Sequence, residues 1–256
     1  MLLKLDSIKK TFCPQTVNET AVLTDLTFYV EEGEFISILG SNGTGKSTLL
    51  NLIAGIERPD EGEIEFCGQN VLKQSPRKLA ADIGRVFQDP KSGTAENLSI
   101  QENLAIASRR GEKITLRRGV SHQAKINFRN ALADLGLGLE NRLSAPVGVL
   151  SGGQRQVLTL LMATLKKPRL LLLDEHTAAL DPATSQIVSE MTDRIVKQHG
   201  QTTLMVTHNV DAAIKYGSRL IMLNRGRIVA DVRGDEKKSL CKDEVLALYH
   251  NEIDWE

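Results

Sequence analysis

The chain has 256 residues, enough for one large domain or two lobes around a sizeable core. Its 32 lysines and arginines balance 32 aspartates and glutamates, so no net field favours nucleic acid or an anionic membrane surface. Three isolated cysteines argue against a disulfide framework or a zinc site. The apolar runs fall short of the roughly 20 residues of a membrane-spanning helix, and the start lacks a signal-peptide pattern, so we expect a cytosolic protein.

The N-terminal segment alternates apolar and polar positions, as at Leu3–Leu5 and Leu26–Val30, which predicts half-buried antiparallel strands. The apolar run Phe35–Leu39 then leads through a glycine-rich turn into an apolar helix at Thr48–Ala54. Another strand is predicted at Ile83–Phe87. This order of strand, turn and helix is typical of an α/β protein.

The middle of the chain, about residues 95–149, has few strand signals, and Gln123–Leu135 has the apolar spacing of a helix. We therefore expect a helical subdomain at about 95–149, inserted into a core formed by about 1–94 and 150–256. The whole chain is expected to be a single domain.

The last third returns to the α/β pattern. A helix is predicted from about Gln154 to Lys166, and the runs Leu170–Leu173 and Thr203–Val206 are typical of parallel strands buried on both faces. A hairpin at Leu220–Val232 and a short helix at Asp243–Tyr249 follow. The expected fold class is α/β, with a mainly parallel sheet, an N-terminal antiparallel β subdomain and an inserted helical subdomain.

The glycine-rich turn Gly40-Ser41-Asn42-Gly43-Thr44-Gly45-Lys46-Ser47 fits the pattern G-x-x-x-x-G-K-[ST] between a strand and a helix. Such glycines let backbone N–H groups point at phosphates, and the helix N-terminus adds a partial positive charge. We expect Lys46 to neutralise phosphates of ATP and the Ser47 hydroxyl to bind Mg²⁺. The alternative is a turn that only caps a helix.

Two carboxylates, Asp174 and Glu175, follow the buried strand Leu170–Leu173. Ligands of α/β proteins bind at such carboxyl ends of strands. Asp174 is therefore a candidate ligand of Mg²⁺, and Glu175 is a candidate base for the attacking water. Considered without other motifs, this pair of carboxylates is better explained as a solvated turn than as a catalytic site. The phosphate loop earlier in the chain makes the catalytic interpretation the preferred one.

The run Leu150-Ser151-Gly152-Gly153-Gln154 opens a predicted helix, with Ser151 as a suitable N-cap. Together with the two preceding motifs, it makes the sequence resemble the ATP-binding cassette (ABC) ATPases over nearly its whole length. The resemblance implies a P-loop NTPase core with ATP and Mg²⁺ as ligands. It assigns Gly40–Ser47 to Walker A, Leu170–Asp174 to Walker B and Leu150–Gln154 to the signature motif.

Further positions take roles from the same resemblance. Gln88 matches the Q-loop, which senses Mg²⁺ and water, and His208 matches the switch histidine that donates to the γ-phosphate. Ala178–Asp181 matches the D-loop, with Asp181 as its carboxylate, and Phe12 stands where an aromatic ring stacks on adenine. Phe12 could also be an ordinary core residue. The nucleotide contacts are expected to be Phe12, Gly40, Ser41, Asn42, Gly43, Thr44, Gly45, Lys46, Ser47 and Thr48.

In this family two cassettes pack head to tail. Ser151, Gly152, Gly153 and Gln154 would then act on the ATP of the partner cassette, in a homodimer or a pair with a related cassette. The resemblance further implies integral membrane permease subunits and a position on the inner face of the cell membrane. A soluble non-transport ATPase, such as an iron–sulfur assembly ATPase, is the alternative, and no nucleic-acid partner is expected.

Two local features narrow the resemblance. The segment Asp174–Asp181 reads DEHTAALD, with His176 where most relatives have proline, and the N-terminal loop reads FCPQTVNE from Phe12. Both resemble a bacterial importer subgroup with an extracytoplasmic lipoprotein receptor, some members of which are linked to aromatic amino acid uptake. A basic cluster is interpreted as solvated surface because it lacks aromatic residues: Arg109, Arg110, Lys113, Arg117 and Arg118.

Overall fold

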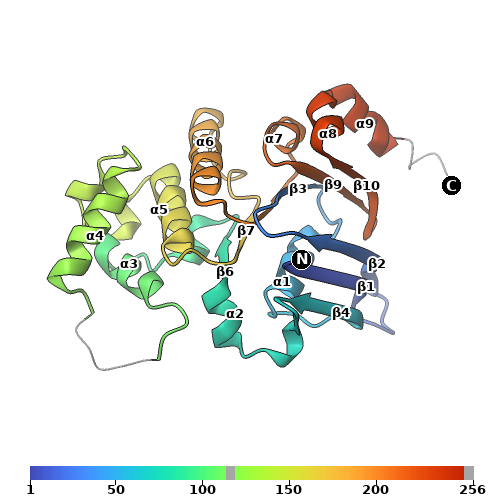
Figure 1. Cartoon of the computed structure of the whole chain (residues 1–256), viewed down its shortest axis with the longest axis horizontal. Helices are drawn as coiled ribbons and strands as arrows, with labels where there is room; N and C mark the ends of the chain where they lie inside the picture. The colour runs from blue at the N-terminus through green and yellow to red at the C-terminus, as the bar shows by residue number, and fades with distance from the viewer. Residues whose placement is uncertain (114–118, 251–256) are drawn as a thin grey trace. The chain divides into compact units, whose positions relative to one another are not determined.

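The computed structural model describes residues 1–113 and 119–250, and Arg117 and Arg118 of the basic cluster lie outside these ranges. The chain divides into two compact units, Met1–Leu79 with Gly200–Glu256, and Ala80–His199. Figure 1 shows the helices and strands of both units.

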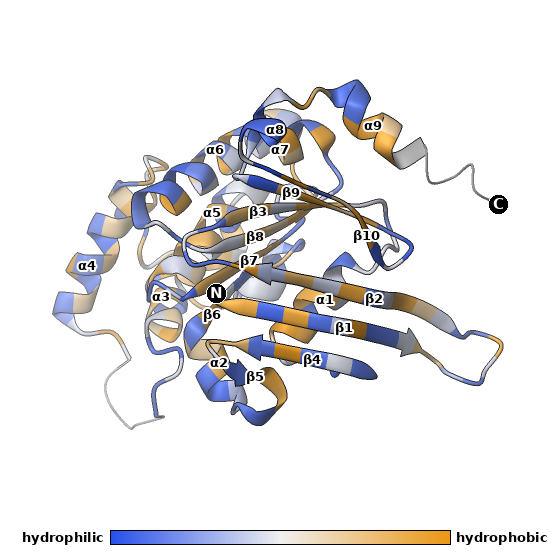
Figure 2. Ribbon diagram, turned by 45° about the vertical axis from the view of Figure 1, so that its right-hand side comes forward, coloured by the Kyte–Doolittle hydropathy of each residue, from blue (hydrophilic) through white to orange (hydrophobic). Residues whose placement is uncertain are grey.

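The first unit contains an antiparallel sheet in the order β2-β1-β4-β5. Its strands are β1 (Leu3–Phe12), β2 (Thr20–Val30), β4 (Glu61–Phe66) and β5 (Gln69–Asn70). Figure 2 shows hydrophobic and hydrophilic residues in turn along β1, and buried and exposed positions alternate over much of β2. Half-buried strands were predicted here, and the prediction is confirmed.

The same unit contains parallel strands. β3 (Phe35–Leu39) pairs in parallel with β8 (Thr203–Thr207) on one side and with β9 (Arg219–Asn224) on the other. β10 (Arg227–Arg233) returns antiparallel to β9 and completes the predicted hairpin. Every residue of β3 and β8 is buried, which explains their continuous apolar runs.

Short helices complete the first unit. A buried cluster joins β3 and β9 to helices α7 (Val210–Lys215) and α9 (Lys242–His250) through Leu39, Ala213, Leu220, Met222 and Val245. The helices are α1 (Lys46–Ile53), the 3-10 turn Val71–Lys73, α2 (Pro76–Asp82, at the boundary of the units), α7 (Val210–Lys215), α8 (Gly234–Ser239) and α9 (Lys242–His250).

In its described residues, the second unit has two parallel strands, β6 (Ile83–Val86) and β7 (Leu170–Asp174), and four helices that lie wholly within it. These helices are α3 (Ile100–Ser108), α4 (His122–Ala133), α5 (Gly152–Thr164) and α6 (Pro182–His199). Three 3-10 turns lie at Pro90–Gly93, Leu139–Asn141 and Val147–Val149. The predicted α/β fold class, with parallel strands, an antiparallel N-terminal sheet and helices, is confirmed.

Within the basic cluster, Arg110 differs from the interpretation as solvated surface. Its guanidinium is partly buried, which lowers its pKa, and it donates to the carbonyl of Ala163 near the end of α5 at 3.0 Å. Arg109 is exposed as expected. Arg110 therefore has a structural role in the second unit.

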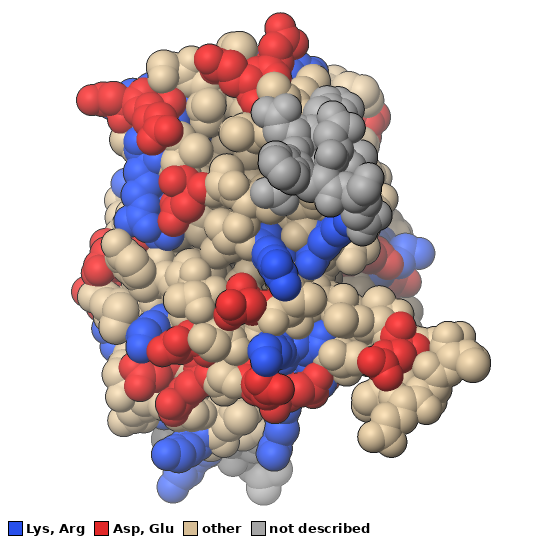
Figure 3. Space-filling view, turned by 90° about the vertical axis from the view of Figure 1, so that its right-hand side faces the viewer, with Lys and Arg blue, Asp and Glu red and all other residues tan. Residues whose placement is uncertain are grey.

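None of the helices in the described residues combines the length and the hydrophobicity that crossing a lipid bilayer requires. On the face drawn in Figure 3, acidic and basic side chains are interspersed among uncharged ones. This distribution agrees with the balanced net charge of the sequence.

Candidate functional site

The predicted phosphate loop forms the turn between β3 and α1 in the first unit. Lys46 is the first residue of α1, and its buried ammonium donates to the carbonyls of Gly40 at 2.8 Å and Ser41 at 2.7 Å. The hydroxyl of Thr44 also donates to the carbonyl of Ser41, at 2.9 Å. The loop thus fixes a positive charge at a helix N-terminus, an arrangement that suits an anionic phosphate.

Glycine is required in this turn for conformation and for space. Gly43 and Gly45 have φ angles of 84° and 90°, in the left-handed region. A Cβ on Gly45 would lie 2.8 Å from the carbonyl oxygen of Val22, and a Cβ on Gly40 would lie 2.6 Å from Thr44 Oγ1. The pattern of glycines therefore reflects real steric limits in this loop.

The switch-histidine candidate lies near the phosphate loop in the same unit. Leu39 of β3 pairs with Thr207 of β8, and the two strands are parallel. Gly40 and His208 are therefore the first residues beyond neighbouring strands at one edge of the sheet. His208 is exposed, and Asn209 caps α7 by accepting from the N–H of Ala212 at 3.0 Å.

Among the other predicted nucleotide contacts, Ser41, Asn42 and Ser47 are exposed, and Thr48 is half-buried. Phe12 is the last residue of β1 and is 37% exposed, with the ammonium of Lys10 5.4 Å from its ring centre. Phe12 is thus not an ordinary core residue, and its ring is accessible for stacking.

In the second unit, the residues predicted to act in hydrolysis lie at the carboxyl ends of two parallel strands. Val86 of β6 pairs with Leu173 of β7 in parallel, so both strands end at the same side. The exposed Gln88 follows β6, while Asp174 ends β7 and Glu175 follows it. Carboxyl ends of neighbouring parallel strands therefore carry these three side chains, as the sequence predicts.

Asp174 is buried, and its carboxylate accepts from Arg85 of β6 at 2.8 Å. Arg85 also stacks over the ring of Phe87, 4.7 Å from the ring centre. A buried carboxylate needs such a partner, because an isolated charge in the interior is costly. Arg85 was not singled out from the sequence, although a cation within an apolar strand is an available signal.

His176, the residue that departs from the family pattern, is almost fully buried. Its Nε2 lies 3.0 Å from the hydroxyl of Thr192 in α6, and burial lowers the pKa of His176 to about 4. The ring is therefore neutral near pH 7. Thr192 in turn donates to the carbonyl of Val188 at 2.8 Å.

The signature segment begins α5 with a complete capping box. Ser151 Oγ accepts from the N–H of Gln154 at 3.2 Å, and Gln154 Oε1 accepts from the N–H of Ser151 at 3.3 Å. Ser151 and Gly152 are exposed, whereas Gly153 is buried against α6. The segment therefore presents its first residues to solvent at a helix N-terminus.

Two neighbouring polar residues anchor this helix. Arg155 bonds to the carboxylate of Glu96 and donates to the carbonyl of Gly148 at 3.1 Å. Gln156 is fully buried and donates to the carbonyl of Phe87 at 3.2 Å, next to Gln88. Gln156 could not be predicted from the sequence, because the contact of a glutamine in a helix depends on the tertiary structure.

Asp181, the D-loop candidate, accepts from the N–H of Thr184 at 3.0 Å at the start of α6. Hydrogen bonds from the side chain and the backbone of Thr184 lower the pKa of this exposed carboxylate. Asp181 therefore stays ionised and stabilises the N-terminus of α6.

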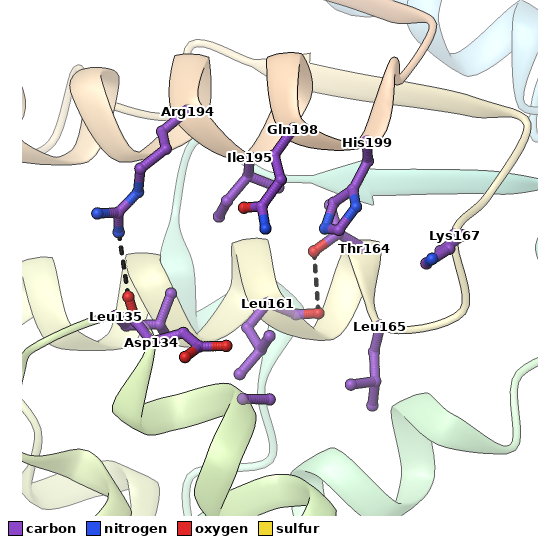
Figure 4. Close-up of a pocket in the computed structure, with 11 residues that line it drawn as sticks. Asp134, Leu135, Leu161, Thr164, Leu165, Lys167, Arg194, Ile195, Gln198 and His199 are labelled. Carbon is purple, nitrogen blue, oxygen red and sulfur yellow. Dashed lines mark hydrogen bonds between the residues drawn. The ribbon is translucent and has the colours of Figure 1, made fainter.

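A separate pocket of about 490 Å³ lies between α4, α5 and α6 (Figure 4). Its lining includes the apolar residues Leu135, Leu161 and Ile195, and Arg194 donates across it to the carbonyl of Asp134 at 3.2 Å. None of the site residues predicted from the sequence lines this pocket.

Comparisons with known proteins identify the family of the chain. The family model described as ABC transporter matches residues 23–178, more than half of the chain. A tyrosine transport ATP-binding protein of Clostridioides difficile (strain R20291) is 43% identical over 245 residues, covering 96% of this chain and 97% of that protein. The phosphonates import ATP-binding protein PhnC of Treponema denticola is 34% identical over 262 residues, covering 99% of this chain and 95% of that protein.

Solved structures show the same fold. The dimeric post-hydrolysis state of the ATP-binding cassette MJ0796, bound to ADP and Pi, superposes with a TM-score of 0.77 at 26% identity, covering 91% of this chain and 98% of that one. One conclusion follows from the sequence motifs, from their position at the carboxyl ends of parallel strands and from these relatives. The chain belongs to the ABC transporter family, as an ATP-binding subunit with an ABC ATPase domain.

Proposed function

We propose that the chain hydrolyses ATP to drive a bacterial importer of an amino acid, with an aromatic amino acid such as tyrosine as cargo. The observation that carries the cargo class is the 43% identity to a tyrosine transport ATP-binding protein across almost the full length of both chains. Other relatives, at 34% and 37% identity, are named for phosphonates and aliphatic sulfonates.

In the first unit, we assign nucleotide binding to the phosphate loop. Lys46 is held by two loop carbonyls and would neutralise the β- and γ-phosphates, while loop N–H groups donate to their oxygens. The exposed ring of Phe12 would stack on adenine, which contributes roughly 1–3 kcal/mol in base–aromatic contacts. His208, at the same sheet edge as Gly40, would donate to the γ-phosphate.

Glu175 is proposed as the general base that accepts a proton from the attacking water, with Gln88 orienting that water. Mg²⁺, when bound, neutralises charge on the phosphates. Its proposed ligands are Ser47, Gln88 and Asp174, whose hydroxyl, amide and carboxylate oxygens are the hard donors that Mg²⁺ prefers. The buried Asp174 carboxylate, already oriented by Arg85, fits this role.

A second cassette would complete the reaction centre. Ser151, Gly152, Gly153 and Gln154 lie at the N-terminus of α5, and two of them are exposed, so they can bind an anion held by another copy. MJ0796 is dimeric in two solved structures, which supports such a pair. We further propose integral membrane permeases, an extracytoplasmic lipoprotein receptor and a location on the inner face of the cell membrane.

Uptake by cells that lack this chain tests the cargo. These cells are expected to lose uptake of radiolabelled tyrosine. The wild-type gene should restore this uptake, and the Glu175→Gln gene should not. Uptake of a phosphonate and of an aliphatic sulfonate is measured in parallel. Normal tyrosine uptake together with loss of another substrate would reject the amino acid. Failure of any integral membrane protein to co-purify with the tagged chain would instead favour the iron–sulfur assembly class.

A further inference from the structure

The proposed base, Glu175, has an unusual backbone conformation. Its φ is 42°, in the left-handed region that residues with a Cβ seldom occupy. Such a conformation is energetically unfavourable and persists only where the surrounding structure imposes it. The side-chain direction of Glu175 therefore depends on what holds the residues on either side of it.

Both neighbours of Glu175 are anchored within the second unit. Asp174, on the N-terminal side, is bound to Arg85 of β6 at 2.8 Å. His176, on the C-terminal side, is 3% exposed, and its Nε2 is 3.0 Å from Thr192 Oγ1 in α6. The carbonyl of Glu175 also accepts from the N–H of Ala178 at 2.9 Å, which closes the turn.

The direction of the hydrogen bond between His176 and Thr192 follows from the donors that are present. Thr192 has one hydroxyl hydrogen, and the hydroxyl donates it to the carbonyl of Val188 at 2.8 Å. Nε2 of His176 must therefore be the donor to Thr192 Oγ1. Thr192 is 1% exposed, so water cannot readily replace this contact.

We propose that His176 is a positioning residue that, through its hydrogen bond to Thr192, ties the turn after β7 to α6 and holds Glu175 in its left-handed conformation. This inference rests on the proposed role of Glu175 as the general base. His176 itself is too deeply buried to contact a substrate. Its effect on hydrolysis passes through the orientation of the carboxylate, and small misplacements of catalytic groups can reduce rates by as much as about 10²-fold.

Steady-state ATP hydrolysis by the full chain tests this role. Thr192→Val removes the acceptor while keeping the shape, and His176→Phe removes the donor. Each variant is expected to lower kcat about tenfold with the KM for ATP unchanged, because the phosphate loop is intact. Thr192→Ser retains the hydroxyl and is expected to stay within about twofold of the wild type.

Thr164→Val is the matched control. Thr164 is buried in α5 and donates to the carbonyl four residues earlier, Leu160, at 2.8 Å, as Thr192 does to Val188. Its substitution removes the same type of helix contact and is expected to leave kcat unchanged. The double variant His176→Phe with Thr192→Val should be no slower than either single variant, since both remove one interaction.

An unchanged kcat in a folded Thr192→Val protein would overturn the inference, as would equal losses in Thr192→Val and Thr164→Val. If the wild type hydrolyses ATP and Glu175→Gln is equally active, the proposed function of Glu175 fails instead. The two failures are therefore distinguishable in one set of assays.

Discussion

Gly153 in the first turn of α5 packs against Thr184 of α6 so closely that a Cβ atom at position 153 would overlap the Thr184 Cγ2 methyl. Thr184 cannot turn away without loss, because its side chain and its N–H both bond to Asp181. The signature segment thus packs against the first turn of α6, and Thr184 of that turn binds Asp181 of the D-loop.

Gly153→Ala is therefore expected to destabilise the protein by about 1–3 kcal/mol, the usual cost of overpacking. Gly152→Ala is the control, because its Cβ would lie 3.4 Å from Leu180 Cδ2, an ordinary contact. Thermal unfolding measures both. Thr184→Ser removes the obstructing methyl and should restore most of the stability of Gly153→Ala; a Gly153→Ala protein as stable as Gly152→Ala would contradict this packing.

Lys46→Ala is expected to weaken ATP binding at least tenfold. The ammonium is the charge that the loop carbonyls of Gly40 and Ser41 hold in place, and hydrogen bonds to charged groups contribute about 1.5–3 kcal/mol. Isothermal titration calorimetry checks this. Lys238→Ala, an equal change of charge at an exposed position of α8, should leave affinity unaltered. Unchanged affinity in Lys46→Ala would rule out the phosphate-loop assignment.

Glu175→Gln is expected to reduce ATP turnover about 10²–10⁴-fold while ATP still binds, because it removes a positioned base. The bound ATP should then hold two copies together, and light scattering with ATP and Mg²⁺ should detect a dimer. Glu236→Gln, at an exposed position in α8, should turn over ATP like the wild type. A Glu175→Gln protein that stays monomeric with saturating ATP would count against the shared site.

Asp231 links stability to pH in the first unit. Burial alone would raise its pKa, but hydrogen bonds from Arg219 and Arg233 lower the pKa below the ordinary 3.8. The carboxylate therefore stabilises the folded protein above pH 3.8, and this contribution is lost as the pH falls through the lower folded-state pKa.

Asp231→Asn, which mimics the protonated acid, is accordingly expected to cost about 1–2 kcal/mol at neutral pH after allowance for solvent screening. Urea unfolding at several pH values should show the difference from the wild type shrinking below pH 3.8. Asp235→Asn, on the surface of α8, should differ little from the wild type at any pH. A difference for Asp231→Asn that does not depend on pH would refute the charge-based explanation.

The fold class and the positions of the motifs could be predicted from the amino-acid sequence alone. Continuous apolar runs predicted the strands β3, β7 and β8, because strands buried on both faces need apolar residues throughout. The glycine pattern of Gly40–Ser47 predicted the phosphate loop, because glycine adopts the positive φ angles of Gly43 and Gly45 far more readily than other residues. Both the burial of a strand and the conformation of a turn depend on residues that are adjacent in the chain, so the sequence pattern indicates them directly.

Helix boundaries were predicted less well. The helix predicted from about Gln154 begins at Gly152, because Ser151 and Gln154 form a capping box around that turn. Likewise, α1 begins at Lys46 rather than Thr48, since the phosphate loop turns directly into the helix.

Contacts between residues far apart in the sequence could not be predicted and became visible only in the folded chain. Arg85 meets Asp174, and His176 meets Thr192, across 89 and 16 residues. Buried polar groups must find partners, but the sequence does not say which, because the choice depends on how strands and helices pack. The sequence thus identified Glu175 as the candidate base, and the structure alone revealed its left-handed backbone and the anchored residues on either side of it.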